Sequence, residues 1–266
     1  MNTEGCTKMG YETITIERNG RLAIVSLNQP QKMNAMDDVM LHELANCFEA
    51  LHKDPTIQVL ILKGEGKVFS AGGDIKAMLT ESFDIADVMI DISRLVKAFY
   101  TLPMVTIAAV HGAAAGLGFS LALAADIIIG EEDSKFAMNF IGIGLIPDGA
   151  GHFFMKERLG VPKAQQMIWA GDVLNGFAAK KVGLVDEVVE NGTAIEQAGQ
   201  LAQKLLHSPL LSMIETKKIL HAQKVAELNS ILEMESVGQT TMRSTKDHLE
   251  GIKAFVEKRT PNFEGK

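Results

Sequence analysis

The chain has 266 residues and a mass of 28.8 kDa, and its 47% hydrophobic content is enough for one large domain with an extensive core. A formal charge of −7 at pH 7 excludes a dedicated nucleic-acid binder, because such proteins concentrate Lys and Arg. Cys6 and Cys47 are too few for a disulfide scaffold and have no metal-ligand spacing, so we expect no metal. With no signal-like apolar segment near Met1, we also expect a cytoplasmic location.

The first elements are predicted from alternation and helical spacing. Polar and apolar residues alternate over residues 11–18, Asn19-Gly20 is a two-residue turn signal, and residues 22–27 return as a strand, which predicts a β-hairpin. Residues 37–53 carry apolar side chains at helical spacing, and Pro55 ends that helix. Strand, turn and helix patterns then alternate to about Val189. This alternation predicts an α/β fold with right-handed βαβ units and a mostly parallel sheet.

Two glycine-bearing turns follow apolar strand-like runs. Residues 59–62 lead into Phe69-Ser70-Ala71-Gly72-Gly73-Asp74, and residues 105–110 lead into a turn over residues 111–118. Glycine permits close backbone approach and positive φ, and the second turn opens a helical stretch whose first N–H groups lack intrahelical acceptors. Neither turn fits a phosphate loop or a dinucleotide fingerprint. We expect the two turns to present backbone N–H groups to one developing oxyanion.

The stretch over residues 98–125 contains no formally charged residue, and it is longer than the roughly 20 residues of a membrane-spanning helix. Pro103 and His111-Gly112 interrupt it, so the pattern favours a buried strand, a turn and a buried helix, and no membrane association. After Asn191-Gly192 the pattern is helical, with helices predicted over residues 195–207, 209–221 and 225–236. The sequence therefore divides into an α/β region, residues 1–191, and a helical region, residues 192–266. The apolar faces of these C-terminal helices must be buried against another surface, so we expect a homo-oligomer.

Further motifs point to a known family. They are Leu27-Asn28-Gln29-Pro30-Gln31-Lys32-Met33-Asn34-Ala35-Met36 and the runs over residues 142–151 and 250–259. With the two turns, and in this order, they make residues 11–266 resemble the crotonase, or enoyl-CoA hydratase/isomerase, superfamily. The resemblance implies a crotonase-like spiral of ββα units that holds an acyl-CoA site, and C-terminal helices that assemble trimers, often paired into hexamers. It implies an acyl-CoA thioester substrate and no cofactor apart from the substrate's own CoA.

The resemblance also assigns residues. It makes the N–H groups of Gly73 and Leu117 the oxyanion donors, with Leu117 standing where glycine is usual. The two glutamates of hydratases fall at Ser120 and Phe140, and neither a phenyl ring nor an unactivated hydroxyl can take a proton at neutral pH, so hydration is disfavoured. We expect Ser120 to bond locally within its helix and Phe140 to form the wall of a dry pocket.

One carboxylate remains near the expected site. By resemblance, Asp148 faces the reacting carbons and can move a proton from C2 to C4 of an unsaturated acyl-CoA, first as base and then as acid. The alternative is that Asp148 caps a helix over residues 149–159. Glu81, Asp84 and His111 are other candidate bases, although a structural role suits His111 better. The residues that the resemblance places along the substrate groove are Met33, Ala35, Ala71, Asp74, Ile75, Phe140 and Pro147.

These residues together predict an acyl-CoA isomerase that shifts a double bond or opens a strained ring next to the thioester. Three alternatives stay open: an acyl-CoA hydrolase or other enolate chemistry, an enoyl-CoA hydratase, and a non-catalytic acyl-CoA-binding protein. Proton exchange at C2 of a saturated acyl-CoA separates an enzyme from a binder, because only a working base catalyses it.

Overall fold

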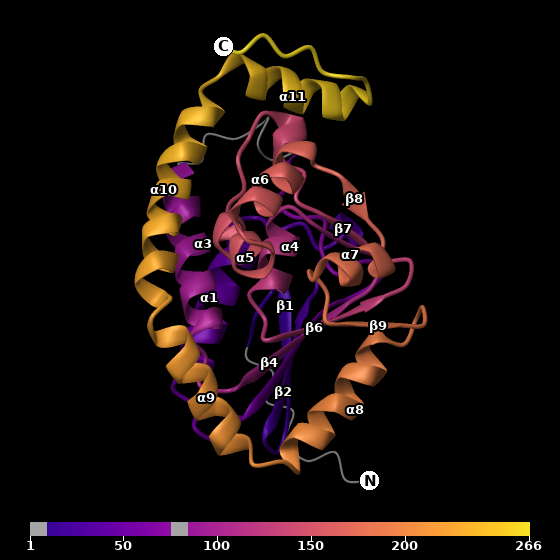
Figure 1. The fold of residues 1–266 in the computed structure, drawn as a ribbon, viewed down its shortest axis with the longest axis vertical. Helices are drawn as coiled ribbons and strands as arrows, with labels where there is room; N and C mark the ends of the chain where they lie inside the picture. Colours follow the sequence, from indigo (N-terminus) through magenta and orange to yellow (C-terminus); the bar gives the residue numbers. More distant parts are fainter. Residues whose placement is uncertain (1–9, 76–84) are drawn as a thin grey trace.

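The computed structural model describes residues 10–75 and 85–266, and a six-stranded sheet forms its centre (Figure 1). The strand order is β1-β2-β3-β4-β6-β9, and only the β1–β2 pair is antiparallel. The predicted hairpin is confirmed, but Asn19 still pairs with Leu22, so the turn residues are Gly20 and Arg21. The strands of this sheet are β1 (Ile14–Asn19), β2 (Leu22–Leu27), β3 (Val59–Gly64), β4 (Val105–Val110), β6 (Ile127–Glu131) and β9 (Glu187–Val189).

Both faces of the sheet are covered, which explains why its central strands are mostly apolar. Leu60 and Leu62 of β3 join a core with α1 (Asp38–His52) and α3 (Ile85–Tyr100). Val59 and Ile61, which point the other way, pack in a second core with α8 (Ala194–Leu206). Alternate residues of a strand face opposite sides of its sheet. In a strand buried on both faces, all side chains therefore face a core, and few of them are polar.

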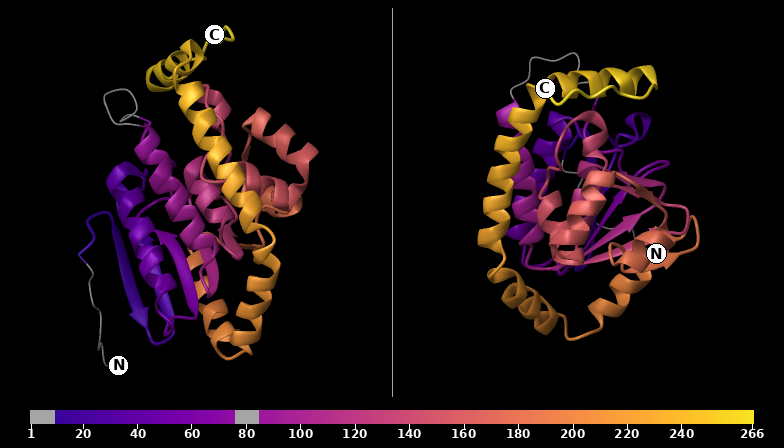
Figure 2. Two further views of the ribbon diagram at one scale, coloured as in Figure 1. Left: turned by 90° about the vertical axis from the view of Figure 1, so that its left-hand side faces the viewer. Right: turned by 45° about the horizontal axis from the view of Figure 1, so that its top comes forward.

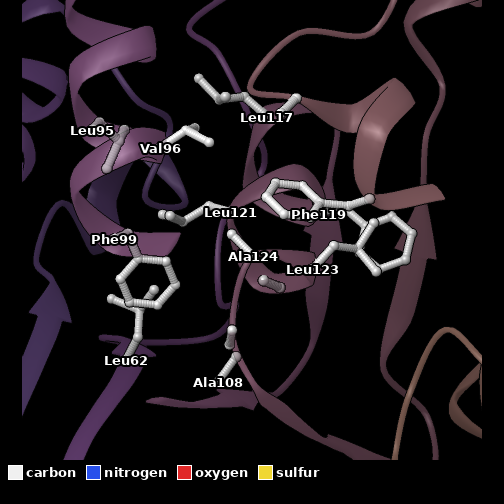
Figure 3. Close-up of a cluster of buried hydrophobic side chains, with 14 of the residues drawn as sticks. Leu62, Leu95, Val96, Phe99, Ala108, Leu117, Phe119, Leu121, Leu123 and Ala124 are labelled. Atoms are coloured by element: carbon white, nitrogen blue, oxygen red, sulfur yellow. The ribbon is translucent and has the colours of Figure 1, made fainter. Parts of the chain in front are cut away.

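The uncharged stretch folds as a strand, a turn and a buried helix, as predicted. After β4, α4 (Leu117–Leu123) is buried along its whole length. Figure 3 shows Leu121 on the side of α4 that faces Leu95 of α3, with Phe119 on the opposite side. Within residues 10–75 and 85–266, no helix is both long enough and apolar enough to cross a membrane.

A second, three-stranded sheet was not predicted. It has the order β5-β7-β8, with β5 and β7 parallel and β8 antiparallel to β7. Strands of two or three residues are too short to show a period of two, so the sequence pattern does not reveal them. Their bounds are β5 (Ala113–Ala115), β7 (Lys135–Ala137) and β8 (Val173–Leu174).

Helices make up the rest of the chain after β9. The three predicted helices are present, and the third, α10, extends to Arg243, seven residues past the predicted end at Ser236. A further helix, α11, lies across one end of the molecule (Figure 2), and α10 packs beside α3. The remaining helical bounds are η1 (Pro30–Lys32), η2 (Phe140–Ile143), α5 (Gly151–Leu159), α6 (Val161–Ala170), α7 (Gly176–Val182), α9 (Leu210–Ala222), α10 (Val225–Arg243) and α11 (Lys246–Glu257).

Candidate active site

A cavity of about 870 Å³ lies where the two glycine-bearing turns, η2, α3 and α10 meet. Part of its apolar lining comes from α1 and α3, and includes Leu41, Val88 and Ile92. Its polar lining includes Lys32 and Asp148. A mostly apolar, concave site with a few polar groups is the usual form of a small-molecule pocket.

The two glycine-bearing turns meet at this cavity. Ser70 N–H donates to Ala113 O at 2.9 Å, and Ala115 N–H donates to Ser70 O at 3.1 Å, so a short parallel bridge joins the turns. Gly72 has a φ of +95°, and a Cβ there would lie 2.6 Å from Ala115 O and 3.5 Å from Leu117 N. Only glycine allows so close an approach in this conformation.

Two backbone N–H groups are left for a ligand. Met36 N–H donates to Gly72 O and Asp74 N–H donates to Met36 O, so Gly73 N–H points away from Met36. Leu117 is the first residue of α4, where an N–H has no intrahelical acceptor. Neither N–H has an acceptor among the residues that the structure describes, and both residues line the cavity.

A buried asparagine holds the first turn in place. Asn34, at a φ of +50°, donates from Nδ2 to Val68 O at 2.9 Å and Phe69 O at 3.2 Å. The neighbouring Met33 accepts from Ala71 N–H through its carbonyl, while its side chain is exposed to solvent. The loop over residues 28–36 therefore supports the turn from behind.

Of the predicted site residues, seven line the cavity and three do not. Met33, Ala35 and Pro147 lie outside the lining, and Ala35 and Pro147 are buried in the packing around it. Lys32, beside Met33, lines it instead. Those that line it are Ala71, Gly73, Asp74, Ile75, Leu117, Phe140 and Asp148.

Asp148 lies on a sharp turn made by Gly149 and Ala150, both of which have a φ near +60°. A left-handed alanine is strained, and Glu235 of α10 stabilises it by accepting from Ala150 N–H at 2.7 Å. Glu235 also accepts from His152 N–H at 3.1 Å, so it satisfies the start of α5. The capping alternative for Asp148 is therefore wrong: α5 begins at Gly151 after Ala150, no side chain of its own turn caps it, and Asp148 contributes only its backbone carbonyl, which accepts from Gly151 N–H.

The surroundings of Asp148 raise its pKa to about 8. Burial is the main cause, the negative charge of Glu235 adds to it, and the positive charge of Arg243 opposes it. Gln239 Nε2 donates to Oδ2 at 3.2 Å, while the buried Oδ1 has no hydrogen-bond partner within residues 10–75 and 85–266. A carboxyl group that titrates near neutrality suits alternate proton acceptance and donation.

A model of the enoyl-CoA hydratase/isomerase family matches residues 17–266. The chain belongs to this family. It is 45% identical, over 92% of this chain and 96% of the relative, to YhaR of Bacillus subtilis (strain 168), whose name assigns it provisionally to the enoyl-CoA hydratase/isomerases. It is 33% identical to the 1,2-epoxyphenylacetyl-CoA isomerase of Escherichia coli (strain K12), over 91% of this chain and 94% of that enzyme.

A solved structure agrees in fold over almost the whole chain. The crystal structure of an enoyl-CoA hydratase from Mycobacterium avium subsp. paratuberculosis K-10 matches with a TM-score of 0.87 and 30% identity. The match covers 95% of this chain and 99% of that one. The expected crotonase-like α/β fold is thereby confirmed. Because hydratases and isomerases both occur among these relatives, the fold does not choose between the two reactions.

Ser120 and Phe140 have different surroundings in this structure. Ser120 is fully buried, and its Oγ donates to Asp148 O at 2.7 Å, so the expectation of a local bond within α4 is wrong. The reason is that Gly149 and Gly151 bring the Asp148 turn against α4; a Cβ on Gly151 would lie 2.9 Å from Ser120 Oγ. Phe140 lines the cavity beside Gly116, as expected of a pocket wall.

Of the other candidate bases, His111 stands apart from the cavity. His111 Nε2 lies 3.1 Å from Gly66 O, and the residue is not part of the lining, in agreement with a structural role. Glu81 and Asp84 lie outside the described residues. In the described part of the chain, no cluster of three or more His, Cys, Asp or Glu side chains is suited to hold a metal ion.

The sequence analysis missed the polar residues that α10 supplies. Glu235, Gln239 and Arg243 are spaced four residues apart, so they lie on one face of the helix, directed at the Asp148 turn and the cavity. The available signal was that these polar residues recur every four positions within a helix that also carries apolar residues. Nothing in the sequence links that signal to a turn about 90 positions earlier.

Proposed function

We propose that this chain is an acyl-CoA isomerase that moves a double bond, or opens a strained ring, next to the thioester. One observation carries the proposal. Asp148, with a pKa of about 8, shares one cavity with the N–H groups of Gly73 and Leu117, which have no acceptor in the described part of the chain. One group can therefore move a proton while two others hold the charge that the movement creates.

The reaction follows from these groups. The thioester oxygen accepts from the two N–H groups, and the Asp148 carboxylate takes a proton from C2 of a 3-enoyl-CoA. The C–H electron pair passes into the thioester carbonyl and forms a dienolate whose oxygen the two donors stabilise. Each such donor typically contributes about 2.7–4 kcal/mol to the transition state. Asp148 then returns the proton at C4, which leaves a conjugated 2-enoyl-CoA and the original carboxylate.

Hydration requires two titratable side chains, and the proposed mechanism uses only one, Asp148. By family resemblance, the hydratase glutamates fall at Ser120 and Phe140. The Ser120 hydroxyl already donates to Asp148 O, and Phe140 has no titratable atom. Neither can activate water while Asp148 supplies the proton.

The rest of the cavity suits an acyl-CoA. Side chains of α3, among them Ile85, Met89 and Ile92, form an apolar wall against which an acyl chain can pack. We also propose a trimer, alone or paired into a hexamer, because Leu211, Ile219 and Val237 of the C-terminal helices are about 70% exposed. A well-folded monomer in sedimentation at micromolar concentration contradicts the assembly but not the isomerase.

The proposal is tested by incubating the protein with 3-hexenoyl-CoA and, separately, with crotonyl-CoA. We expect conjugated 2-hexenoyl-CoA to form, with little hydration of crotonyl-CoA and no release of free CoA. Deuterium exchange at C2 of butyryl-CoA in heavy water distinguishes an enzyme from a binding protein. Release of free CoA as the main product identifies a hydrolase, and failure to form 2-hexenoyl-CoA contradicts the proposal.

A further inference from the structure

Gln239 is fully buried in α10 and reaches the carboxylate of Asp148. Its Nε2 makes two hydrogen bonds, to Ile146 O at 2.7 Å and to Asp148 Oδ2 at 3.2 Å. The proposed isomerisation accounts for Asp148 but assigns nothing to Gln239.

The Ile146 contact fixes the orientation of the amide. A backbone carbonyl only accepts hydrogen bonds, so it selects the NH₂ end of Gln239 and repels Oε1. The amide therefore cannot rotate by half a turn without placing two oxygens in contact. As a consequence, the group that faces Asp148 is always a donor.

The hydrogen bond from Gln239 to Asp148 makes the two carboxylate oxygens inequivalent. Oδ2 receives the Gln239 hydrogen bond, whereas Oδ1 is buried and has no partner among the residues that the structure describes. A lone pair that already accepts a hydrogen bond is less basic than one that does not. A proton therefore adds more readily at Oδ1.

We propose that Gln239 is the positioning residue of Asp148. Its Nε2 is a fixed donor that holds Oδ2 of the carboxylate, and Oδ1 is left to exchange the proton with substrate. The inference rests on the proposed function for the substrate, but not for the hydrogen bond. In the reaction, the C2 proton forms an O–H bond at Oδ1 and the C–H electron pair enters the dienolate. The proton then leaves Oδ1 for C4, and Oδ2 stays bound to Gln239 throughout.

Other charged groups surround Asp148. Glu235 raises the pKa of Asp148 and Arg243 lowers it, both from α10. On α5, His152 pairs with Glu235 at 2.7 Å, and on α11, His248 bonds to Ile143 O and interacts electrostatically with Arg243. Gln239 adds a neutral donor to this set. A donor to the charged form favours ionisation, so its removal should raise the pKa of Asp148 further.

The test is Gln239→Met, which keeps much of the side-chain volume but removes the donor. Infrared difference spectra against Asp148→Asn follow the carbonyl band of the protonated Asp148 carboxyl as pH is varied. Hydrogen bonds to charged groups are worth enough to move the midpoint upward by about one pH unit. The pH profile of kcat/KM for 3-hexenoyl-CoA should move by the same amount, with roughly tenfold less activity on the low-pH side and little change in KM.

Two further variants keep the test decisive. Thr240→Met places the same new side chain on the exposed neighbouring position of α10 and should leave the midpoint unchanged. Gln239→Leu also removes the donor, adds no charge, and should raise the midpoint in the same direction. This variant serves if Gln239→Met does not fold.

The outcomes separate the two proposals. An infrared midpoint that rises in protein inactive on every acyl-CoA supports the Gln239 assignment and contradicts the isomerase. An active isomerase whose midpoint is the same in wild type and Gln239→Met overturns the Gln239 assignment alone. A lower activity with an unmoved midpoint also overturns it, because that is the signature of a merely structural role.

Discussion

The two walls of the cavity are built in different ways. In the proposed mechanism, the wall that holds negative charge consists of backbone N–H groups from Gly73 and Leu117, fixed by the bridge between two turns. The wall proposed to move the proton consists of the Asp148 side chain, which Gln239 contacts and whose pKa depends on the charges of Glu235 and Arg243 of α10. The first wall is made by local chain geometry and the second by packing between distant segments.

This difference has a consequence for the chemistry of the family. Backbone donors survive almost any change of side chain, so the charge-holding wall can persist while the reaction changes. The proton-moving wall can be altered by single side chains, and the resemblance places Ser120 and Phe140 where hydratases carry their glutamates. Each wall can therefore be altered separately from the other.

The largest expected effect comes from removing the proton carrier. Asp148→Asn keeps the size of the side chain but cannot accept the C2 proton, and isomerisation should fall by about 10²–10⁴ with little change in acyl-CoA binding. Steady-state kinetics and calorimetric binding of butyryl-CoA measure the two effects. Activity within a fewfold of wild type clears Asp148 of catalysis.

The same variant should be more stable than wild type. The folded-state pKa of Asp148 is about 8, well above its ordinary value of 3.8, so the folded protein holds this proton more tightly than the unfolded chain. Between these two values, stability therefore falls as pH rises, and the penalty is largest above pH 8. Asp148→Asn removes this stability penalty. Its melting temperature should exceed that of wild type at alkaline pH, and the difference should shrink toward about pH 4.

The charge-holding wall is tested at Leu117 by two substitutions that differ in the backbone. Leu117→Pro removes the N–H at a helix position that tolerates proline, and should lower kcat/KM by about 10²–10³. Leu117→Ala keeps the N–H, so its activity should stay within about tenfold of wild type, although loss of a buried side chain costs stability by about 2–5 kcal/mol. Equal losses of activity in both variants, measured at a temperature where both are folded, show that the side chain and not the N–H matters.

A smaller effect is expected from pH alone. The ionised Asp148 is the base, so kcat/KM should rise with pH through a midpoint near 8. The increase from one pH unit below the midpoint to one above it is about tenfold. A profile that is flat across this range contradicts the assignment of Asp148 as the base.

The smallest effect tests the long-range part of the second wall. Glu235→Gln removes a negative charge that raises the pKa of Asp148, so the midpoint of the pH profile should move downward. One acceptor at the start of α5 is lost as well, at a cost to stability of about 1–3 kcal/mol. Glu233→Gln, at an exposed position on the same helix, is the matched control and should change neither property.

The sequence predicts the two walls unequally, and for a physical reason. The strands β3 and β4, the turns that follow them and the burial of α4 are encoded in residues close together in the chain, and all were predicted. The cavity-facing place of Asp148 was predicted by family resemblance, but its contacts were not. Ser120 bonds to a carbonyl 28 positions away, and Gln239 reaches Asp148 across 91 positions, and no local pattern expresses such contacts.

The central claim is that this cavity isomerises acyl-CoA and does not hydrate it. A single mixture of 3-hexenoyl-CoA and crotonyl-CoA measures both reactions. Chromatography separates the two hexenoyl-CoA isomers, which have the same mass, and mass spectrometry detects the water that hydration adds. We predict conversion of 3-hexenoyl-CoA to 2-hexenoyl-CoA, lost in Asp148→Asn, with hydration of crotonyl-CoA far slower. Hydration with a turnover near the enzyme median of about 10 s⁻¹ contradicts the account.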